Sequence, residues 1–99
     1  KQHGWWETKR NPGELLMLIV SEVVETFEDY RHGKELNACH YVSDEQGQAK
    51  PVGIPIELAD VIIRVLDISE AWGINMESML RIKMDYNKKR PYHHGNLRA

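Results

Sequence analysis

Four carboxylates occur as two pairs with helical spacing. Glu22 and Glu25 stand three residues apart, and so do Glu57 and Asp60. Residues three apart share one face of an α-helix, so each pair forms one carboxylate patch. If the two helices pack side by side, the four acids meet, and their repulsion is costly unless protons or a cation neutralise it. The pattern therefore predicts a site for a divalent cation.

The kind of cation follows from the donors. They are all carboxylate oxygens, with no cysteine and no helical histidine beside them, and such hard ligands favour Mg²⁺, with Mn²⁺ as a substitute, over Zn²⁺. Acid pairs also occur on solvated helices, so a plain polar surface stays open for Glu22 and Glu25. Glu57 and Asp60 are more informative, because they interrupt a segment that is apolar nearly all round, where unpaired charge is poorly tolerated.

A third segment carries cations. Lys83, Asn87 and Arg90 fall on one helical face and combine a point charge, an amide and a two-pronged donor, a set that suits phosphate oxygens. The alternative is a solvated basic turn that complements the helix dipole. An acidic metal patch together with a cationic face is typical of phosphoryl transfer, which needs charge stabilisation more than a covalent nucleophile.

The first element that must position these groups is a helix from about Pro12 to Gly33. Asn11 is its expected N-cap and Pro12 its first residue. Its apolar residues recur with helical spacing, which predicts a face buried in the core. These residues are Leu16, Ile19, Val20, Val23, Val24 and Phe27.

The second helix is expected over residues 55–72. It is apolar on almost every side apart from one polar stripe, so we expect other helices to surround it, with Trp72 in the core. The stripe consists of Glu57, Asp60, Arg64 and Asp67. A third helix is expected over residues 76–89, capped by Asn75.

Residues 34–53 are predicted to form a long loop with no strand, since Gly47, Pro51 and Gly53 stand among polar residues without clear periodicity. Such a loop is either a functional lid or a solvated connector. The fold class is predicted to be all-α. Three antiparallel helices make half of a four-helix-bundle-like core, which we expect a second copy to complete in a homodimer or a dimer of dimers.

The composition excludes several classes of function. The 99 residues carry 13 Lys and Arg against 15 Asp and Glu, a formal net charge of -2, without the basic excess that nucleic acids or anionic membranes demand. No apolar run approaches the ~20 residues of a membrane span. Cys39 is the single cysteine, which excludes a disulfide framework and favours a reducing compartment. We expect a cytoplasmic protein that binds neither nucleic acid nor membrane.

Three segments carry a resemblance: LLMLIVSEVVETFEDYRHG, IPIELADVIIRVLD and KMDYNKKRPYHHG. They contain Glu-x-x-Glu, Glu-x-x-Asp and Lys-x-x-x-Asn-x-x-Arg in consecutive helices, cover most of the chain and together resemble the MazG-like nucleoside triphosphate pyrophosphohydrolases, of the all-α superfamily that includes dCTP and dUTP pyrophosphatases. The resemblance implies one domain over residues 1–99, with an arm (1–11), the 34–53 loop and a tail (91–99). The sequence departs from the family pattern at Ser21-Glu22, where a Glu-Glu doublet is common, and in the long spacing between the acid pairs.

What the resemblance implies is Mg²⁺-dependent hydrolysis of (deoxy)nucleoside triphosphates to monophosphate and pyrophosphate, as in house-cleaning of nucleotide pools. The implied roles are cation binding by the four acids, phosphate binding by the third-helix set and base binding by Trp6 and Asn11. His94 is a candidate phosphate contact in the tail. Water is expected to attack the α-phosphorus, with Glu22 or Glu25 as the catalytic base. Packing of Trp6 against the bundle and a disordered tail remain alternatives.

A different class of function is also open. The chain could be a non-enzymatic helical dimerisation module, with its acids as a surface stripe and its basic end as a partner site. A di-iron carboxylate bundle is excluded, because that site uses Glu-x-x-His pairs and the sequence has none.

Overall fold

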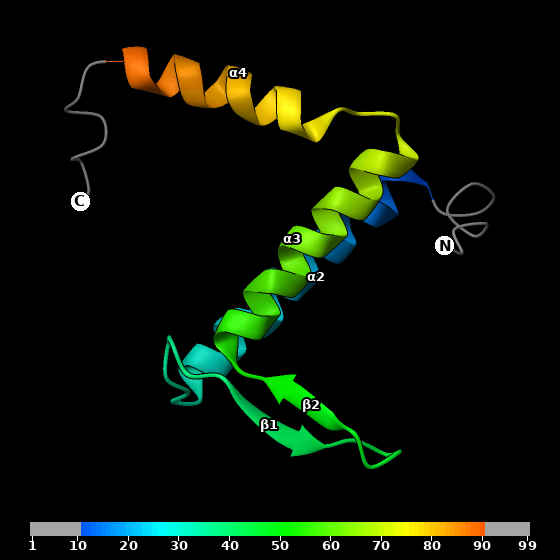
Figure 1. Ribbon diagram of the computed structural model, residues 1–99, viewed down its shortest axis with the longest axis vertical. Helices are drawn as coiled ribbons and strands as arrows, with labels where there is room; N and C mark the ends of the chain where they lie inside the picture. Colours follow the sequence, from blue (N-terminus) through cyan, green and yellow to red (C-terminus); the bar gives the residue numbers. More distant parts are fainter. Residues whose placement is uncertain (1–10, 91–99) are drawn as a thin grey trace.

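The computed structural model describes residues 11–90, which form three helices and one β-hairpin (Figure 1). The order of elements is α2 (Pro12–Arg31), β1 (His40–Ser43), β2 (Ala49–Val52), α3 (Ile54–Ala71) and α4 (Met76–Lys89). The predicted helical class is confirmed, and each of the three helices begins and ends within two residues of its expected bounds. None of the helices in the described part is long and apolar enough to cross a membrane.

Two predicted caps are confirmed. The Asn11 side chain accepts a hydrogen bond from the Glu14 amide at 2.8 Å, and Pro12 opens α2. At the start of α4, the Asn75 side chain accepts one from the Ser78 amide at 3.0 Å. Both bonds satisfy amides that have no partner within the helix, so these asparagines fix where α2 and α4 begin.

The prediction of a strandless loop over residues 34–53 is wrong. β1 and β2 form an antiparallel hairpin in which His40 pairs with Val52 and Ser43 with Ala49. The turn between them is closed by the Asp44 carboxylate, which accepts from the amides of Gln46 and Gln48 at 2.9 and 2.8 Å. All of β1 is exposed, so its sequence lacks the apolar alternation that marks a half-buried strand.

Gly53 joins the hairpin to α3 and leaves no room for a side chain. Its φ is +126°, and a Cβ there would collide with the carbonyl oxygen of Ala38. Gly53→Ala is therefore expected to lower the free energy of unfolding by about 2–4 kcal/mol. Thermal and urea unfolding of the variant measure this.

Gly73→Ala is the matched control for Gly53→Ala. Gly73 also has a positive φ, +71°, but its Cβ would meet nothing within 4 Å, so only the conformational cost of about 1–2 kcal/mol is expected. Equal losses in the two variants would show that the contact with Ala38 is unimportant.

α2 and α3 lie side by side and run antiparallel, with the hairpin at one end of the pair (Figure 1). The core between them is small. Leu15 and Ile68 are 2% and 3% exposed, with Leu18 and Ile19 partly buried against them. This apolar contact occupies the end of the pair away from the hairpin.

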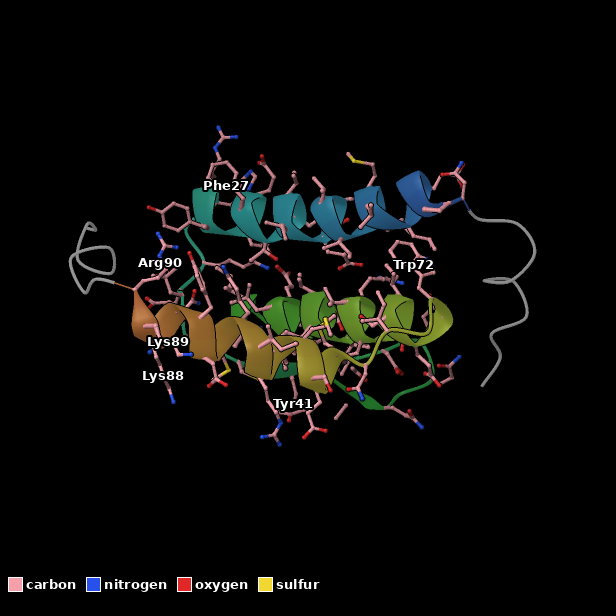
Figure 2. The ribbon with its side chains drawn as sticks, turned by 90° about the horizontal axis from the view of Figure 1, so that it is seen from above. Phe27, Tyr41, Trp72, Lys88, Lys89 and Arg90 are labelled. Carbon is pink, nitrogen blue, oxygen red and sulfur yellow. The ribbon has the colours of Figure 1, made fainter. Side chains whose placement is uncertain are left out.

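The prediction that the apolar face of α2 is buried is wrong for a single chain. Only Ile19 of that face is partly buried, and Trp72, also assigned to the core, is 41% exposed. The exposed members are Leu16, Val20, Val23, Val24 and Phe27. Figure 2 shows Phe27 and Trp72 toward opposite ends of the helix pair. The helical periodicity marked the apolar face correctly, but α3 packs on a neighbouring face of α2 that includes Leu15, Glu22 and Thr26.

In the polar stripe of α3, Glu57 and Arg64 lie against α2, as the expected meeting of the acid pairs requires, whereas Asp60 is exposed. Glu57, Arg64 and Asp67 are partly buried, whereas Ile62 and Ile63 are 60% and 54% exposed. The charged side of α3 thus lies nearer to α2 than its apolar side does. This arrangement places charged groups between the helices and leaves apolar surface outside.

α4 follows α3 after a short turn and extends away from the helix pair (Figure 1). None of its residues is buried. Its apolar side chains, among them Ile82 and Met84, are 64% and 58% exposed.

Candidate functional site

The candidate site is the charged part of the interface between α2 and α3. Arg64 of α3 crosses to α2, where its Nη2 donates to Glu22 Oε2 at 2.8 Å. The two side chains are 34% and 22% exposed. A pair of this kind is screened less by solvent than a surface ion pair.

Glu57 lies further toward the hairpin, next to Asp29 of α2. Burial raises the pKa of Glu57 above its ordinary value of 4.5, and the hydrogen bonding and negative charge of Asp29 raise it further. Glu57 Oε1 is buried and has no hydrogen-bond partner. Two neighbouring carboxyls with one unsatisfied oxygen form a place that favours either a proton or a cation.

Thr26 and Lys34 complete the surroundings of this carboxyl pair. The Thr26 hydroxyl donates to the Glu22 carbonyl at 3.0 Å, and Lys34 Nζ lies 3.8 Å from Asp29 Oδ1. Both residues act on the pKa of Glu57 in the lowering direction, against burial and Asp29. The lysine therefore neutralises only part of the local negative charge.

The four predicted acids divide into two kinds. Glu22 and Glu57 are partly buried between α2 and α3, whereas Glu25 and Asp60 are exposed. Over residues 11–90, no group of three or more acidic, histidine or cysteine side chains is close enough to hold a metal ion. The structure thus brings the acids to two adjacent helices without bringing all four carboxylates together.

Lys83 and Asn87 of the predicted phosphate-binding set lie on α4 and Arg90 directly follows it, away from the acids (Figure 1). Lys83 Nζ and the Arg90 guanidinium stand 5.0 and 5.5 Å from the ring centroid of Tyr86. Figure 2 shows Arg90 at the end of α4 with Lys88 and Lys89. Tyr86 thus lies beside Lys83 and Arg90, two of the three predicted phosphate contacts. The sequence shows Tyr86 between Lys83 and Asn87, but no role was predicted for it.

Asp29 and Arg64 are the other participants that sequence reasoning missed. Arg64 was noted only as part of a stripe. Asp29 stands seven residues after Glu22, a spacing that returns to the same helical face and could have identified it.

The remaining predicted contacts lie at the chain ends. Trp6 and His94 fall outside the described residues. The side-chain oxygen of Asn11 is used as the cap of α2, so the structure gives this residue a structural role.

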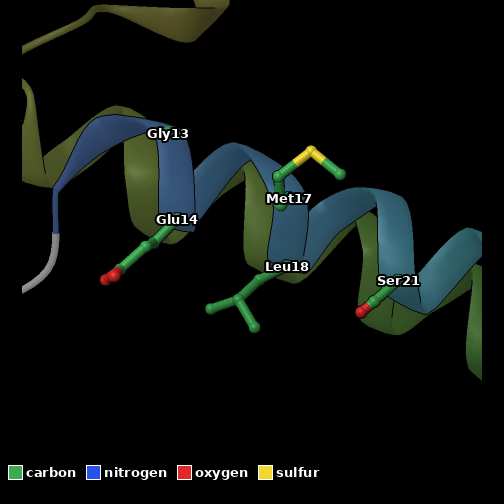
Figure 3. Close-up of a pocket in the computed structure, with 5 residues that line it drawn as sticks. All are labelled: Gly13, Glu14, Met17, Leu18 and Ser21. Atoms are coloured by element: carbon green, nitrogen blue, oxygen red, sulfur yellow. The ribbon is translucent and has the colours of Figure 1, made fainter.

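A shallow depression lies along the first half of α2 (Figure 3). It is lined by Gly13, Glu14, Met17, Leu18 and Ser21. Because all five belong to one helix and only Glu14 is charged, the depression offers no convergent set of catalytic groups.

The raised pKa of Glu57 predicts a dependence of stability on pH. A carboxyl whose pKa is raised by folding contributes stability below pH 4.5 that is lost as the pH rises through the raised value. Glu57→Gln keeps a neutral side chain at every pH. Without divalent cations, the variant is therefore expected to melt at a higher temperature than wild type at pH 7, and the difference should shrink below pH 4.5.

Melting curves between pH 3.5 and 8 in EDTA test this expectation. Glu25→Gln removes one negative charge from an exposed position of α2 and is the control. If Glu57→Gln melts below wild type at pH 7, the ionised form of Glu57 is the one that the fold favours.

Comparisons of the chain with family models, curated proteins and solved structures found no match.

Proposed function

We propose that the chain hydrolyses (deoxy)nucleoside triphosphates to nucleoside monophosphate and pyrophosphate with Mg²⁺ as cofactor. The observation that supports this most is the charged interface of α2 and α3. It keeps Glu22 and Glu57 partly buried on adjacent helices and leaves Glu57 Oε1 buried without a partner. A buried carboxylate oxygen without a partner favours uptake of a proton or a cation, and the proposal assigns this one to a cation.

The chemistry of the donors suits a divalent cation, although residues 11–90 do not bring three of these side chains close enough together to hold one. Glu22, Glu25, Glu57 and Asp60 all offer carboxylate oxygens, and Asp29 adds another beside Glu57. Hard oxygens with excess negative charge are the surroundings that Mg²⁺ and Mn²⁺ prefer. A bound Mg²⁺ supplies neutralisation of the phosphate oxygens as their charge changes.

The chain's own residues have separate tasks in this proposal. Lys83 and Arg90, held on one face by Tyr86, bind the distal phosphates, and Asn87 donates to the same chain of phosphates. Glu22 or Glu25 accepts the proton of the attacking water. The same Lys83 and Arg90 side chains stabilise the negative charge of the leaving pyrophosphate.

The same proposal includes a second copy of the chain. Exposed apolar side chains follow α2, α3 and α4, and the described residues bury only Leu15, Ile54 and Ile68 among hydrophobics. We propose that two copies pack these faces together into a four-helix-bundle-like core, as a homodimer or a dimer of dimers. Each Å² of apolar surface buried in such an interface would stabilise the assembly by about 25 cal/mol.

A non-enzymatic interaction module is the second candidate. The exposed apolar faces favour it as much as they favour an enzyme that dimerises. The two functions differ in metal dependence: an enzyme binds Mg²⁺ and a nonhydrolysable nucleotide in a coupled manner, whereas a module does not. Isothermal titration with Mg²⁺, in the presence and absence of the nucleotide, separates them.

Turnover tests the proposal. The full chain is incubated with a panel of ribo- and deoxynucleoside triphosphates and Mg²⁺, with EDTA as control, and monophosphate and pyrophosphate are measured. Equal amounts of the two products, abolished by EDTA, are expected for at least one nucleotide. Absence of hydrolysis across the whole panel would contradict the proposed activity.

A further inference from the structure

α4 stands apart from the rest of the described chain. None of its residues is buried, and Figure 1 shows it directed away from α2 and α3. The chain has a radius of gyration of 17.1 Å, whereas a compact domain of about 100 residues has about 13 Å. A single chain of this shape leaves apolar surface in water, so another molecule is needed to cover it.

The direction of α4 is set by the turn that precedes it. The Ile74 amide donates to the Ser69 carbonyl at 2.8 Å, and Gly73 has a φ of +71°, the pattern that closes the end of a helix. Asn75 then caps α4 at the next residue. No residue remains between the closed end of α3 and the cap of α4, so α4 cannot fold back onto its own helix pair without loss of these bonds.

One face of α4 is apolar in its first half and cationic in its second. Met79 and Leu80 begin this face and are 45% and 53% exposed. Lys83, Asn87 and Arg90 continue it in the turns that follow, since about 3.6 residues make one turn. A surface that fits this face must be apolar at one end and acidic at the other.

The pair of α2 and α3 has an apolar side and an acidic side. The contacts between the two helices fix how each is turned about its axis. With about 3.6 residues per turn, Val20 and Ile62 fall on one side of the plane of the pair, and Glu25 and Asp60 fall on the other. All four residues are exposed. Leu18, two turns before Glu25, is partly buried on the acidic side, so this side changes from apolar to charged along its length and complements α4.

A second copy brings the two complementary surfaces together. α4 has 14 residues and therefore a length of about 21 Å, whereas packed helices lie about 8–10 Å apart. α4 is thus long enough to pass a second copy stacked on the apolar side and to reach the acidic side of that copy. In a two-fold symmetric assembly, each copy places its α4 on the other in the same way.

We propose that α4 packs on the acidic side of a second copy and that each proposed site is shared between two chains. One chain supplies Glu25 and Asp60, and the other supplies Lys83, Asn87 and Arg90. This inference rests on the proposed function. It accounts for the separation of the cationic residues from the acids within one chain, because the two sets meet only in the assembly.

Mixed assemblies of two inactive variants test the sharing of the site. Asp60→Asn removes an acid and Lys83→Ala removes a cation, and both positions are exposed, so each variant should fold and lose turnover. When the two variants are co-expressed, about half of the paired chains contain one of each, with one site that carries both substitutions and one that carries neither. The mixture should therefore recover about a quarter of wild-type turnover. If the mixture stays inactive, each site is built from one chain and the proposal is overturned.

A chain that carries both substitutions is the matched control. Co-expressed with wild type, it inactivates both sites of every mixed pair when sites are shared, so about a quarter of the turnover of wild type alone should remain. If about half remains, the sites lie within single chains. An active wild type with either contrary result overturns the exchange of α4 alone, whereas a wild type without turnover contradicts the proposed function.

A magnetic-resonance measurement tests the exchange of α4 without reference to turnover. A nitroxide is attached to Lys88→Cys in a Cys39→Ser chain, which is then allowed to exchange with ¹⁵N-labelled wild type. Because the nitroxide and the ¹⁵N label are on different chains, loss of an amide signal reports proximity between two copies. The amide signals of Glu25 and Asp60 should lose most of their intensity. If both keep full intensity, α4 does not lie on the acidic side of a second copy and the proposal is overturned.

Discussion

Asp60→Asn is expected to reduce Mg²⁺-dependent turnover by about 100-fold or more while the fold and its melting temperature stay close to wild type. The reason is a separation of roles. Asp60 is exposed, and within residues 11–90 it makes no hydrogen bond or ion pair. Loss of its charge therefore costs the fold little, whereas loss of a cation ligand removes the neutralisation that phosphoryl transfer requires.

Asp67→Asn is the matched control for this variant. Asp67 lies seven residues further along α3, on the same stripe, and is not a proposed ligand. It should keep full activity. Full activity in Asp60→Asn would show that the ligand assignment is wrong, and equal losses in both variants would indicate a general effect of charge on α3.

The second large effect is expected for Ile62→Glu, which should convert the protein to monomers and abolish turnover. Ile62 is 60% exposed and is followed by Ile63, at 54%, on the outer face of α3. In an interface between two copies, a charge at this position is buried without a partner and costs several times the free energy of an ordinary surface substitution. In a chain that works alone, the same substitution is close to neutral.

Size-exclusion chromatography with light scattering distinguishes these cases. Wild type should elute as a multiple of 11.5 kDa and Ile62→Glu as a single chain. Gln46→Glu, which adds the same charge to the exposed hairpin turn, should leave the mass of the assembly unchanged. A wild-type monomer with full activity would contradict the proposed assembly.

Much of the helical framework is predictable from local chemistry. Asn11 and Asn75 mark the starts of α2 and α4 in the sequence, because a capping side chain accepts a hydrogen bond from an amide only two or three residues away. The bounds of α3 follow equally from its continuous apolar pattern. Features of this kind depend on neighbours in sequence, so a single sequence contains them.

Which face of each helix packs against its neighbour is not predictable in the same way. The apolar face of α2 that contains Val20 and Val24 reads as core, yet those side chains are 46% and 50% exposed, because α3 packs against the neighbouring face. Which face meets which helix depends on contacts between distant residues. The pair of Arg64 with Glu22, 42 residues apart, has no local signal.

The hairpin shows a different limit. Its strands have four residues each, and β1 has no buried face, so no alternation of apolar residues records it. Asp44 and Gly47 do mark the turn, because the Asp44 carboxylate accepts from amides within it and Gly47 has a φ of +80°. A search for turn chemistry, in place of apolar periodicity, would have found it.

The position of bond cleavage tests the central claim most directly. Hydrolysis of a nucleoside triphosphate in ¹⁸O-labelled water, followed by mass spectrometry of the products, shows which phosphorus the water attacks. Attack at the α-phosphorus places the label in the nucleoside monophosphate and leaves the pyrophosphate unlabelled, which is the predicted result. Label in pyrophosphate, or orthophosphate as the first product, would contradict a pyrophosphohydrolase.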